Sequence, residues 1–317
     1  MAVRSIRFLL PAVAFVLSLT ALSCVYDYED CPDELPLLIV SDWHKSPKAR
    51  PGGMAYIFFP ETDSIPWRFD FIGPSAGKVV LPVGTYNFLS FNDDASNVLF
   101  AEEATYVGYE IYTASAGSDY DSGEKVLRPP GMMWGCAYDK VQLQYDGVNW
   151  VDNDSVPGTT MMSADFILAA IQMPLTAHYT LRIEDIENLS EVSSMSACLS
   201  GLAGSLFPAT GNKGRYPSTL TFKVSRLGSE LAGGDFYTFG IPAAPSAVNT
   251  LSIFVVRNDG RHLRYKFDVT EQVRSAADPM EVLLLLRGLS IDSPEGGSAG
   301  FDITVDGWET IEVNIKD

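Results

Sequence analysis

The chain has 317 residues, with 40 acidic against 22 basic side chains and a formal net charge of −18. A surface this acidic repels nucleic-acid phosphates and anionic lipid headgroups, so we expect no nucleic-acid partner and no charge-driven membrane binding. The length is sufficient for two domains of ordinary size, each with its own core.

The first 23 residues have the layout of a secretory signal peptide. Arg4 and Arg7 form a short basic start, and the apolar run Phe8–Ser23 follows. This run contains a proline and is shorter than the about 20 apolar residues that a membrane-spanning helix needs. A basic start, an apolar middle and a small-residue end are the marks of a segment removed on export. We therefore predict a signal peptide over residues 1–23.

Cys24 follows the small residues directly. This position predicts a lipoprotein signal, in which the Cys24 thiol is lipidated and becomes the new N-terminus. Ala21 stands where the usual lipoprotein box has leucine, and the alternative is an ordinary signal peptide with a chance cysteine. Because adsorption by charge is disfavoured, membrane attachment would come from the lipid. Several acyl chains hold a protein stably, whereas a single chain holds it marginally.

Three further cysteines, Cys31, Cys136 and Cys198, remain if Cys24 carries lipid. Three thiols cannot all pair within one chain, and no Cys/Cys or Cys/His spacing suggests a metal ligand set, so we predict no metal site. An exported protein meets oxidising conditions, which allow a Cys31–Cys136 disulfide. Cys198 lies among small residues and is predicted to be a buried thiol.

Beyond Cys31 the pattern is strand after strand, without a long helical period. Strands are predicted at Leu35–Val40, Met54–Phe59, Trp67–Ile72, on either side of Val83, at Tyr106–Tyr112, Val141–Tyr145, Phe166–Met173, His178–Ile186, Thr219–Ser225, Leu251–Arg257, Leu263–Val269, Val282–Leu286, Phe301–Val305 and Ile311–Ile315. Asn258-Asp259-Gly260 predicts a hairpin turn, and Leu189–Leu206 a short helix or a bulged connection. The apolar run Val282–Leu286 predicts a strand buried on both faces.

Many short strands separated by turns predict an all-β protein with two sandwiches in tandem. The polar segment Asn149–Gly158 ends in Pro-Gly and is the best candidate for the boundary between them. We therefore predict an N-terminal sandwich over residues 24–152 and a C-terminal sandwich over residues 153–317.

Catalytic motifs are missing from the sequence. The three histidines lie far apart, and the spacings of zinc proteases, P-loops and serine hydrolases do not occur. Asp119, Asp121 and Glu124 resemble part of a calcium loop, but the spacing is incomplete and favours a solvated acidic loop. The five tryptophans could include a sugar-stacking platform, although tryptophan also fills sandwich cores. We predict a non-enzymatic protein without a cofactor other than the lipid on Cys24.

The stretch from Cys24 to Asp30-Cys31-Pro32 resembles the mature N-terminus of fimbrillin-superfamily lipoproteins, the anchor or accessory subunits of fimbriae in Bacteroides-type Gram-negative bacteria. Further segments look like the first and second domains of that family: Met54–Pro60 and Leu81–Asn92, then Ala177–Ile183, Leu199–Gly201, Phe236–Gly240 and Lys266–Thr270. The resemblance implies two transthyretin-like β-sandwiches, a lipid anchor in the outer membrane, and a role in attaching or assembling fimbriae. The acids directly after Cys24 also resemble surface-export signals of some Gram-negative lipoproteins.

Fimbrial assembly proceeds by strand addition, in which an open sheet edge accepts a strand from a neighbouring subunit. In shaft subunits of this superfamily, cleavage after an arginine beyond the first strand removes that strand and opens the groove. The arginine in the matching loop here is Arg50, and Pro51 follows it. Proline after the scissile bond generally blocks trypsin-like cleavage, because its ring removes the N–H and restrains the backbone. We predict that the first strand, with Leu35, Leu37 and Ile39, stays in place.

Together these features predict an outer-membrane lipoprotein, exposed at the cell surface, that anchors, caps or helps to assemble fimbriae. Its partners would be fimbrial subunit proteins, and the lipid on Cys24 would hold it in the membrane. The alternative is a surface lipoprotein that binds glycans through aromatic residues on one sandwich.

Overall fold

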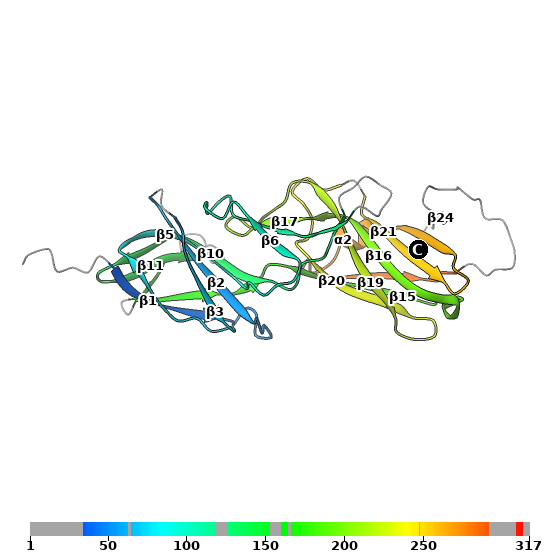
Figure 1. Cartoon of the computed structure of the whole chain (residues 1–317), viewed down its shortest axis with the longest axis horizontal. Coiled ribbons are helices and arrows are strands. Elements are labelled where there is room, and N and C mark those ends of the chain that lie inside the picture. Colours follow the sequence, from blue (N-terminus) through cyan, green and yellow to red (C-terminus); the bar gives the residue numbers. More distant parts are fainter. Residues whose placement is uncertain are drawn as a thin grey trace, which may run out of the picture.

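The computed structural model describes residues 34–62, 65–117, 126–152, 160–163, 166–246, 248–291 and 309–312. These residues are overwhelmingly strands, so the all-β prediction is confirmed. Two β-bodies lie end to end along the long axis (Figure 1). The helical elements of the described residues are the short helix α2 (Thr270–Arg274) and the 3-10 turn η3 (Leu189–Glu191). Neither has the length and apolarity needed to cross a membrane.

The first body is a sandwich of a three-stranded and a seven-stranded sheet. The small sheet has the order β13-β1-β4, and the large one has the order β12-β11-β10-β5-β2-β3 with β14 beside β10. Their bounds are β1 Glu34–Asp42, β2 Gly53–Pro60, β3 Trp67–Ile72, β4 Lys78–Pro82, β5 Gly84–Phe91, β10 Trp134–Gln144, β11 Gly147–Asp152, β12 Thr160–Ser163, β13 Ile167–Ile171 and β14 Met173–Pro174. Buried side chains of both sheets form one apolar cluster between them.

The central strand β2 is buried on both faces, as its continuous apolar sequence dictates. Met54, Tyr56 and Phe58 point into the core between the two sheets of the first body. The alternate residues Ala55, Ile57 and Phe59 belong to a second cluster on the other side of the large sheet. Side chains alternate across a strand, so an apolar residue at every position requires a cover on each face.

A four-stranded sheet provides that second cover and joins the two bodies. Its order is β18-β17-β7-β6, with β6 Val98–Ala101, β7 Glu110–Thr113, β17 Ser205–Phe207 and β18 Asn212–Lys213. Tyr112 of β7 pairs with Ser205 of β17, although the two lie far apart in sequence. Leu206 and Phe239 from the second half share the cluster with Ile57 from the first. The two bodies are therefore connected through a common core.

The second body is one ten-stranded sheet folded around its own core. The order is β23-β15-β20-β19-β16-β21-β22-β24, with β8 and β9 attached through β19. The bounds are β8 Ser115–Gly117, β9 Val126–Leu127, β15 Ala177–Glu184, β16 Val192–Ala203, β19 Pro217–Arg226, β20 Ala232–Thr238, β21 Thr250–Arg257, β22 His262–Asp268, β23 Glu281–Arg287 and β24 Glu309–Glu312. Strand β19 pairs with β16 along most of its length and with β20 only at Ser225 and Arg226. It thus passes from one layer to the other, and the layers enclose the largest core cluster.

Strand β16 occupies the segment predicted to be a short helix or a bulged connection. Its pairing with β19 shifts register between Leu199 and Leu202, which is a β-bulge. Gly201 lies in this bulge with φ 78°, a left-handed conformation that glycine adopts without strain. The Asn249 side-chain amide donates to the carbonyls of Ser200 and Gly201 and so holds the bulge.

The structure differs from the sequence prediction at the division between the halves and at the run Val282–Leu286, and the strand predicted at Tyr106–Tyr112 is limited to β7, Glu110–Thr113. Strands β12, β13 and β14 pair with strands of the first half, so its sheets continue to Pro174, beyond the predicted division at residues 152 and 153. Segment Asn149–Asp152 lies within β11 rather than in a linker. The run Val282–Leu286 is not buried on both faces, because β23 is an edge strand and its Leu283 is 54% exposed. The predicted strand Phe301–Val305 lies outside the described residues.

Candidate functional site

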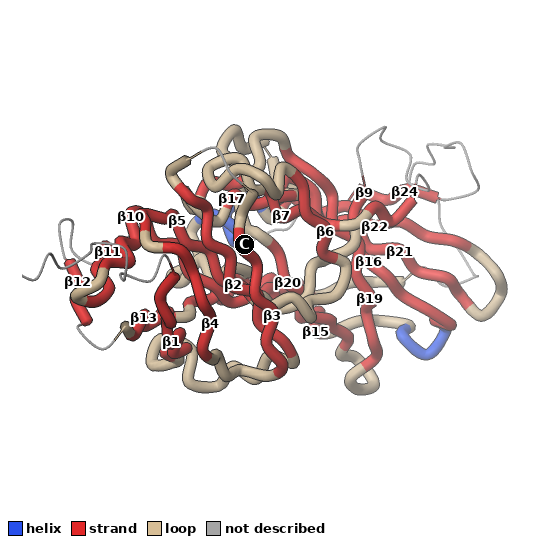
Figure 2. Tube along the Cα trace, turned by 60° about the vertical axis from the view of Figure 1, so that its left-hand side comes forward, coloured by secondary structure: helices blue, strands red, loops and turns tan. Residues whose placement is uncertain are grey.

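Strand β1 lies in the middle of its sheet, between two neighbours that occupy both of its edges (Figure 2). It runs parallel to β13, with Leu38 opposite Ile167, and antiparallel to β4, with Leu37 opposite Val79. Leu38 N–H donates to the Phe166 carbonyl at 2.8 Å. A strand paired on both edges leaves no open groove at its place in the sheet.

The predicted side chains of β1 enter the core of the first body. Leu35, Leu37 and Ile39 are 6%, 0% and 1% exposed and face the large sheet, because alternate side chains of a strand share one face. Full burial of each such side chain stabilises the fold by roughly 1.5–3 kcal/mol. Removal of β1 would expose this apolar surface, so the strand is an integral part of the sandwich.

The carboxyl end of β1 is tied to the opposite sheet and to its own loop. The Ser41 hydroxyl and the Tyr56 hydroxyl on β2 lie 2.5 Å apart. Burial raises the pKa of Tyr56 to about 12, so its hydroxyl is neutral at physiological pH. Asp42 accepts a hydrogen bond from the His44 N–H at 2.9 Å, which lowers the pKa of the carboxyl.

The loop after β1 presents Arg50 but conceals its flanking residues. Arg50 is exposed, whereas Ala49 and Pro51 are buried. The Arg50 guanidinium donates to the carbonyls of Pro47 and Ala49, at 3.1 and 2.6 Å. Gly52 N–H donates to the Asp94 carboxylate at 2.6 Å. A protease that needs an extended substrate therefore meets a turn bonded on both sides of the arginine, in addition to the proline itself.

Cys136 lies in a buried polar cluster of the first body. Its thiol is 3.7 Å from the Ser90 hydroxyl, and the Gln172 amide nitrogen donates to the same hydroxyl at 2.6 Å. Gln172 is fully buried, and its carbonyl accepts from Ser46 in the loop after β1. Cys24 and Cys31 lie outside the described residues, so the predicted lipid site and the Cys31–Cys136 disulfide stay predictions. Cys198, predicted to be a buried thiol, is 4% exposed.

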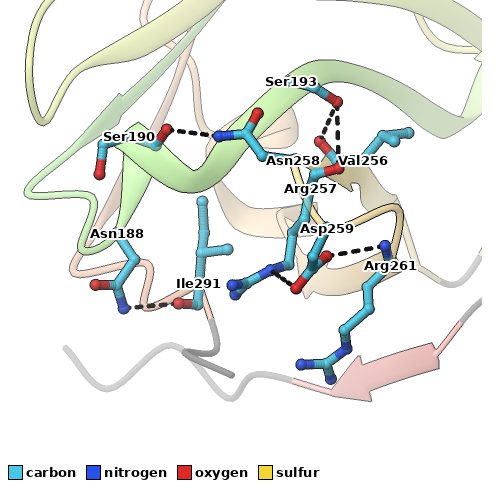
Figure 3. Close-up of polar contacts among 9 residues, drawn as sticks. All are labelled: Asn188, Ser190, Ser193, Val256, Arg257, Asn258, Asp259, Arg261 and Ile291. Atoms are coloured by element: carbon cyan, nitrogen blue, oxygen red, sulfur yellow. Dashed lines mark hydrogen bonds and ion pairs between the residues drawn. The ribbon is translucent and has the colours of Figure 1, made fainter. Parts of the chain in front are cut away.

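A second polar cluster fixes the β21–β22 hairpin to the segment before β16 (Figure 3). The predicted turn at Asn258–Gly260 is present, since Gly260 N–H donates to the Arg257 carbonyl and Gly260 has φ 85°. The Asn258 amide donates to the Ser190 carbonyl at 3.0 Å. Arg257 is 2% exposed and pairs with Asp259 at 3.2 Å, so the carboxylate compensates a buried charge. The sequence gives no signal for this burial.

No group of histidine, cysteine and acidic side chains suited to a metal occurs among the residues that the structure describes. The acidic loop with Asp119, Asp121 and Glu124 lies outside them. The half-buried His178 contacts the exposed acids Glu281 at 3.0 Å and Asp235 at 3.7 Å, as surface ion pairs between neighbouring strands. The most fully paired and buried of the predicted site features that the structure describes is therefore strand β1.

These features define an all-β protein whose first strand is built into its own sandwich. The chain belongs to the family described as "Domain of unknown function (DUF5119)", whose model matches residues 24–223. No curated protein matches its sequence.

Solved structures extend the comparison. A candidate adhesin from Bacteroides ovatus ATCC 8483 is 18% identical with a TM-score of 0.62, over 83% of this chain and 94% of that chain, and has the same fold. The fimbrial anchor protein Mfa2 from Porphyromonas gingivalis is 14% identical with a TM-score of 0.48, over 88% and 99%. A second candidate adhesin from Bacteroides ovatus is 12% identical with a TM-score of 0.49, over 87% and 94%.

Proposed function

We propose that this protein is a surface lipoprotein of the outer membrane that anchors or caps fimbriae in cell adhesion, without catalytic activity. The observation that carries the proposal is β1, which is paired on both edges and buried in the first core. A subunit that keeps its first strand does not accept a donor strand at that place, as an anchor or a cap requires.

Three further observations support this role. Cys24 follows a signal-peptide pattern and offers a lipid attachment point. Pro51 and the bonded turn around Arg50 oppose the cleavage that would release β1. The fold is shared with a protein described as a candidate adhesin. Fimbrial subunits are the proposed partners, bound by strand addition at another sheet edge.

The tether is tested by replacing the proposed lipid-bearing residue, Cys24→Ser, in cells that express the protein with its signal peptide. We expect the variant to leave the membrane fraction and appear in the soluble fraction, because the acidic chain has no charge-driven affinity for lipid. Cys31→Ser is the matched control and should stay with the membrane. A Cys24→Ser protein that remains in the membrane fraction would contradict the tether.

The anchoring role has a separate readout in the same cells. If the protein holds fimbriae to the surface, the Cys24→Ser strain should shed fimbriae into the medium, measured by immunoblot of the polymerised subunit. Fimbriae that stay attached to cells while the variant is soluble would refute anchoring and leave the tether intact.

A further inference from the structure

Two adjoining hollows lie where the four-stranded sheet connects the two bodies. The first has a volume of about 620 Å³ and is lined by Val107, Phe207, Asn212, Lys213, Arg215 and Ala244, among others. The second, of about 600 Å³, shares Phe207 and Arg215 with the first. We call the two together the junction groove. Each hollow falls within the about 300–1,000 Å³ range of small-molecule sites.

The junction groove carries positive charge on an otherwise acidic protein. Lys213 and Arg215 both line it, and neither has an ion pair with an acidic side chain of the described residues. The first hollow has no acid in its described lining. Burial lowers the pKa of Lys213, because it removes part of the water around the ammonium. The half-buried Lys213 and the exposed Arg215 together favour an anionic occupant, because a carboxylate accepts charge-assisted hydrogen bonds from both.

Aromatic and hydroxyl groups also line the groove, and the second hollow includes one acidic side chain, Glu110, against the two cations of the groove. Tyr216 is 74% exposed, and the Arg215 guanidinium lies 5.7 Å from the centre of its ring. Tyr112 and the serines Ser205 and Ser218 line the second hollow. An exposed aromatic face suits stacking with a sugar ring, and hydroxyls suit hydrogen bonds to sugar hydroxyls. This combination distinguishes the groove from a plain basic patch.

We infer that the junction groove binds an acidic oligosaccharide whose sugar rings carry carboxylates. Lys213 and Arg215 would pair with the carboxylates, and Tyr216 would stack on a ring. The inference rests on the proposed adhesive role for its biological setting, whereas the binding itself needs neither the lipid nor a fimbrial partner. Loss of either one therefore does not affect the test.

The test uses the untethered Cys24→Ser protein and calorimetric titration with oligogalacturonate. We expect binding, with affinity reduced at least tenfold by the double variant Lys213→Met/Arg215→Gln and several-fold by Tyr216→Ala. The matched control Lys78→Met/Lys223→Met removes the same charge from exposed strand positions and should leave the affinity unchanged. A neutral dextran oligosaccharide should not bind. Circular dichroism confirms that each variant is folded.

Three results would overturn the inference. Absence of oligogalacturonate binding would refute the acidic-saccharide site, and equal affinity of the Lys213→Met/Arg215→Gln variant would place any binding elsewhere. A poly-glutamate peptide that binds as tightly as oligogalacturonate would show an acidic-peptide site instead of a saccharide site. None of these results bears on whether Cys24 holds the protein in the membrane.

Discussion

Leu37 lies at the centre of β1, fully buried between the two sheets of the first body. Its neighbours on the same face, Leu35 and Ile39, complete an apolar row that meets Tyr56 and Phe58 across the core. The contribution of β1 to stability therefore comes from a few buried side chains. Truncation of one of them should lower the free energy of unfolding of the whole sandwich.

Leu37→Ala is expected to lower the free energy of unfolding by about 2–5 kcal/mol, since it leaves a cavity between two sheets. Denaturant titration, followed by tryptophan fluorescence, measures the change. Val40→Ala on the same strand is the matched control, because Val40 is 42% exposed, and it should cost less than about 1 kcal/mol. Equal effects of the two variants would show that β1 does not contribute its buried face to the core.

At the residue scale, local pattern decides what the sequence can predict. The apolar run Leu35–Val40 is contained in one segment, so the strand could be predicted, but every position of the run is apolar and only the structure shows which face is buried. The contact of Gln172 with Ser90 could not, because the two residues lie 82 positions apart. The burial of Pro51 could not be predicted either, because it depends on how the loop folds back on the sandwich.

At the element scale, strand β17 connects the two bodies. It comes from the second half, pairs with β7 of the first, and places Leu206 in a cluster with Ile57 and Leu89. Because β17 and β7 pair and share this cluster, a change that destabilises one body should also destabilise the other. The coupling can be tested at Leu206, which is 2% exposed.

Leu206→Ala should destabilise both bodies together, by about 2–5 kcal/mol. Hydrogen exchange followed by mass spectrometry should show faster exchange in peptides from β2 and from β21 alike. Leu283→Ala, at an exposed position of edge strand β23, serves as control and should change neither. Faster exchange limited to the four-stranded sheet would contradict a common core.

Strand patterns in the sequence indicated most elements but not their partners. Trp67–Ile72 coincides with β3, and Leu251–Arg257 differs from β21 by one residue. Strand pairing in the first half continues past residues 152 and 153, because β13 crosses back to pair with β1, and no local signal in the sequence indicates this pairing. The prediction that Val282–Leu286 is buried on both faces was wrong for a similar reason. Its composition fits a central strand, but the sheet topology places β23 at an edge.

At the scale of the whole molecule, the acidic chain and the closed first sandwich lead to the same proposal. A net charge of −18 disfavours membrane binding by charge, which is consistent with the proposed lipid on Cys24, and the central position of β1 disfavours its release. The junction groove adds a cationic recess for an acidic glycan. The membrane tether, the retained strand and the groove lie in different parts of the chain and can be tested separately.

The most direct test of the central claim is the mass of the N-terminal peptides of the protein recovered from its native outer membrane. We expect a chain that begins at Cys24 with a mass increase equal to its acyl and glyceryl groups, together with an intact peptide that spans Arg50 and Pro51. A chain that begins at Pro51 or beyond, or an unmodified Cys24, would contradict it.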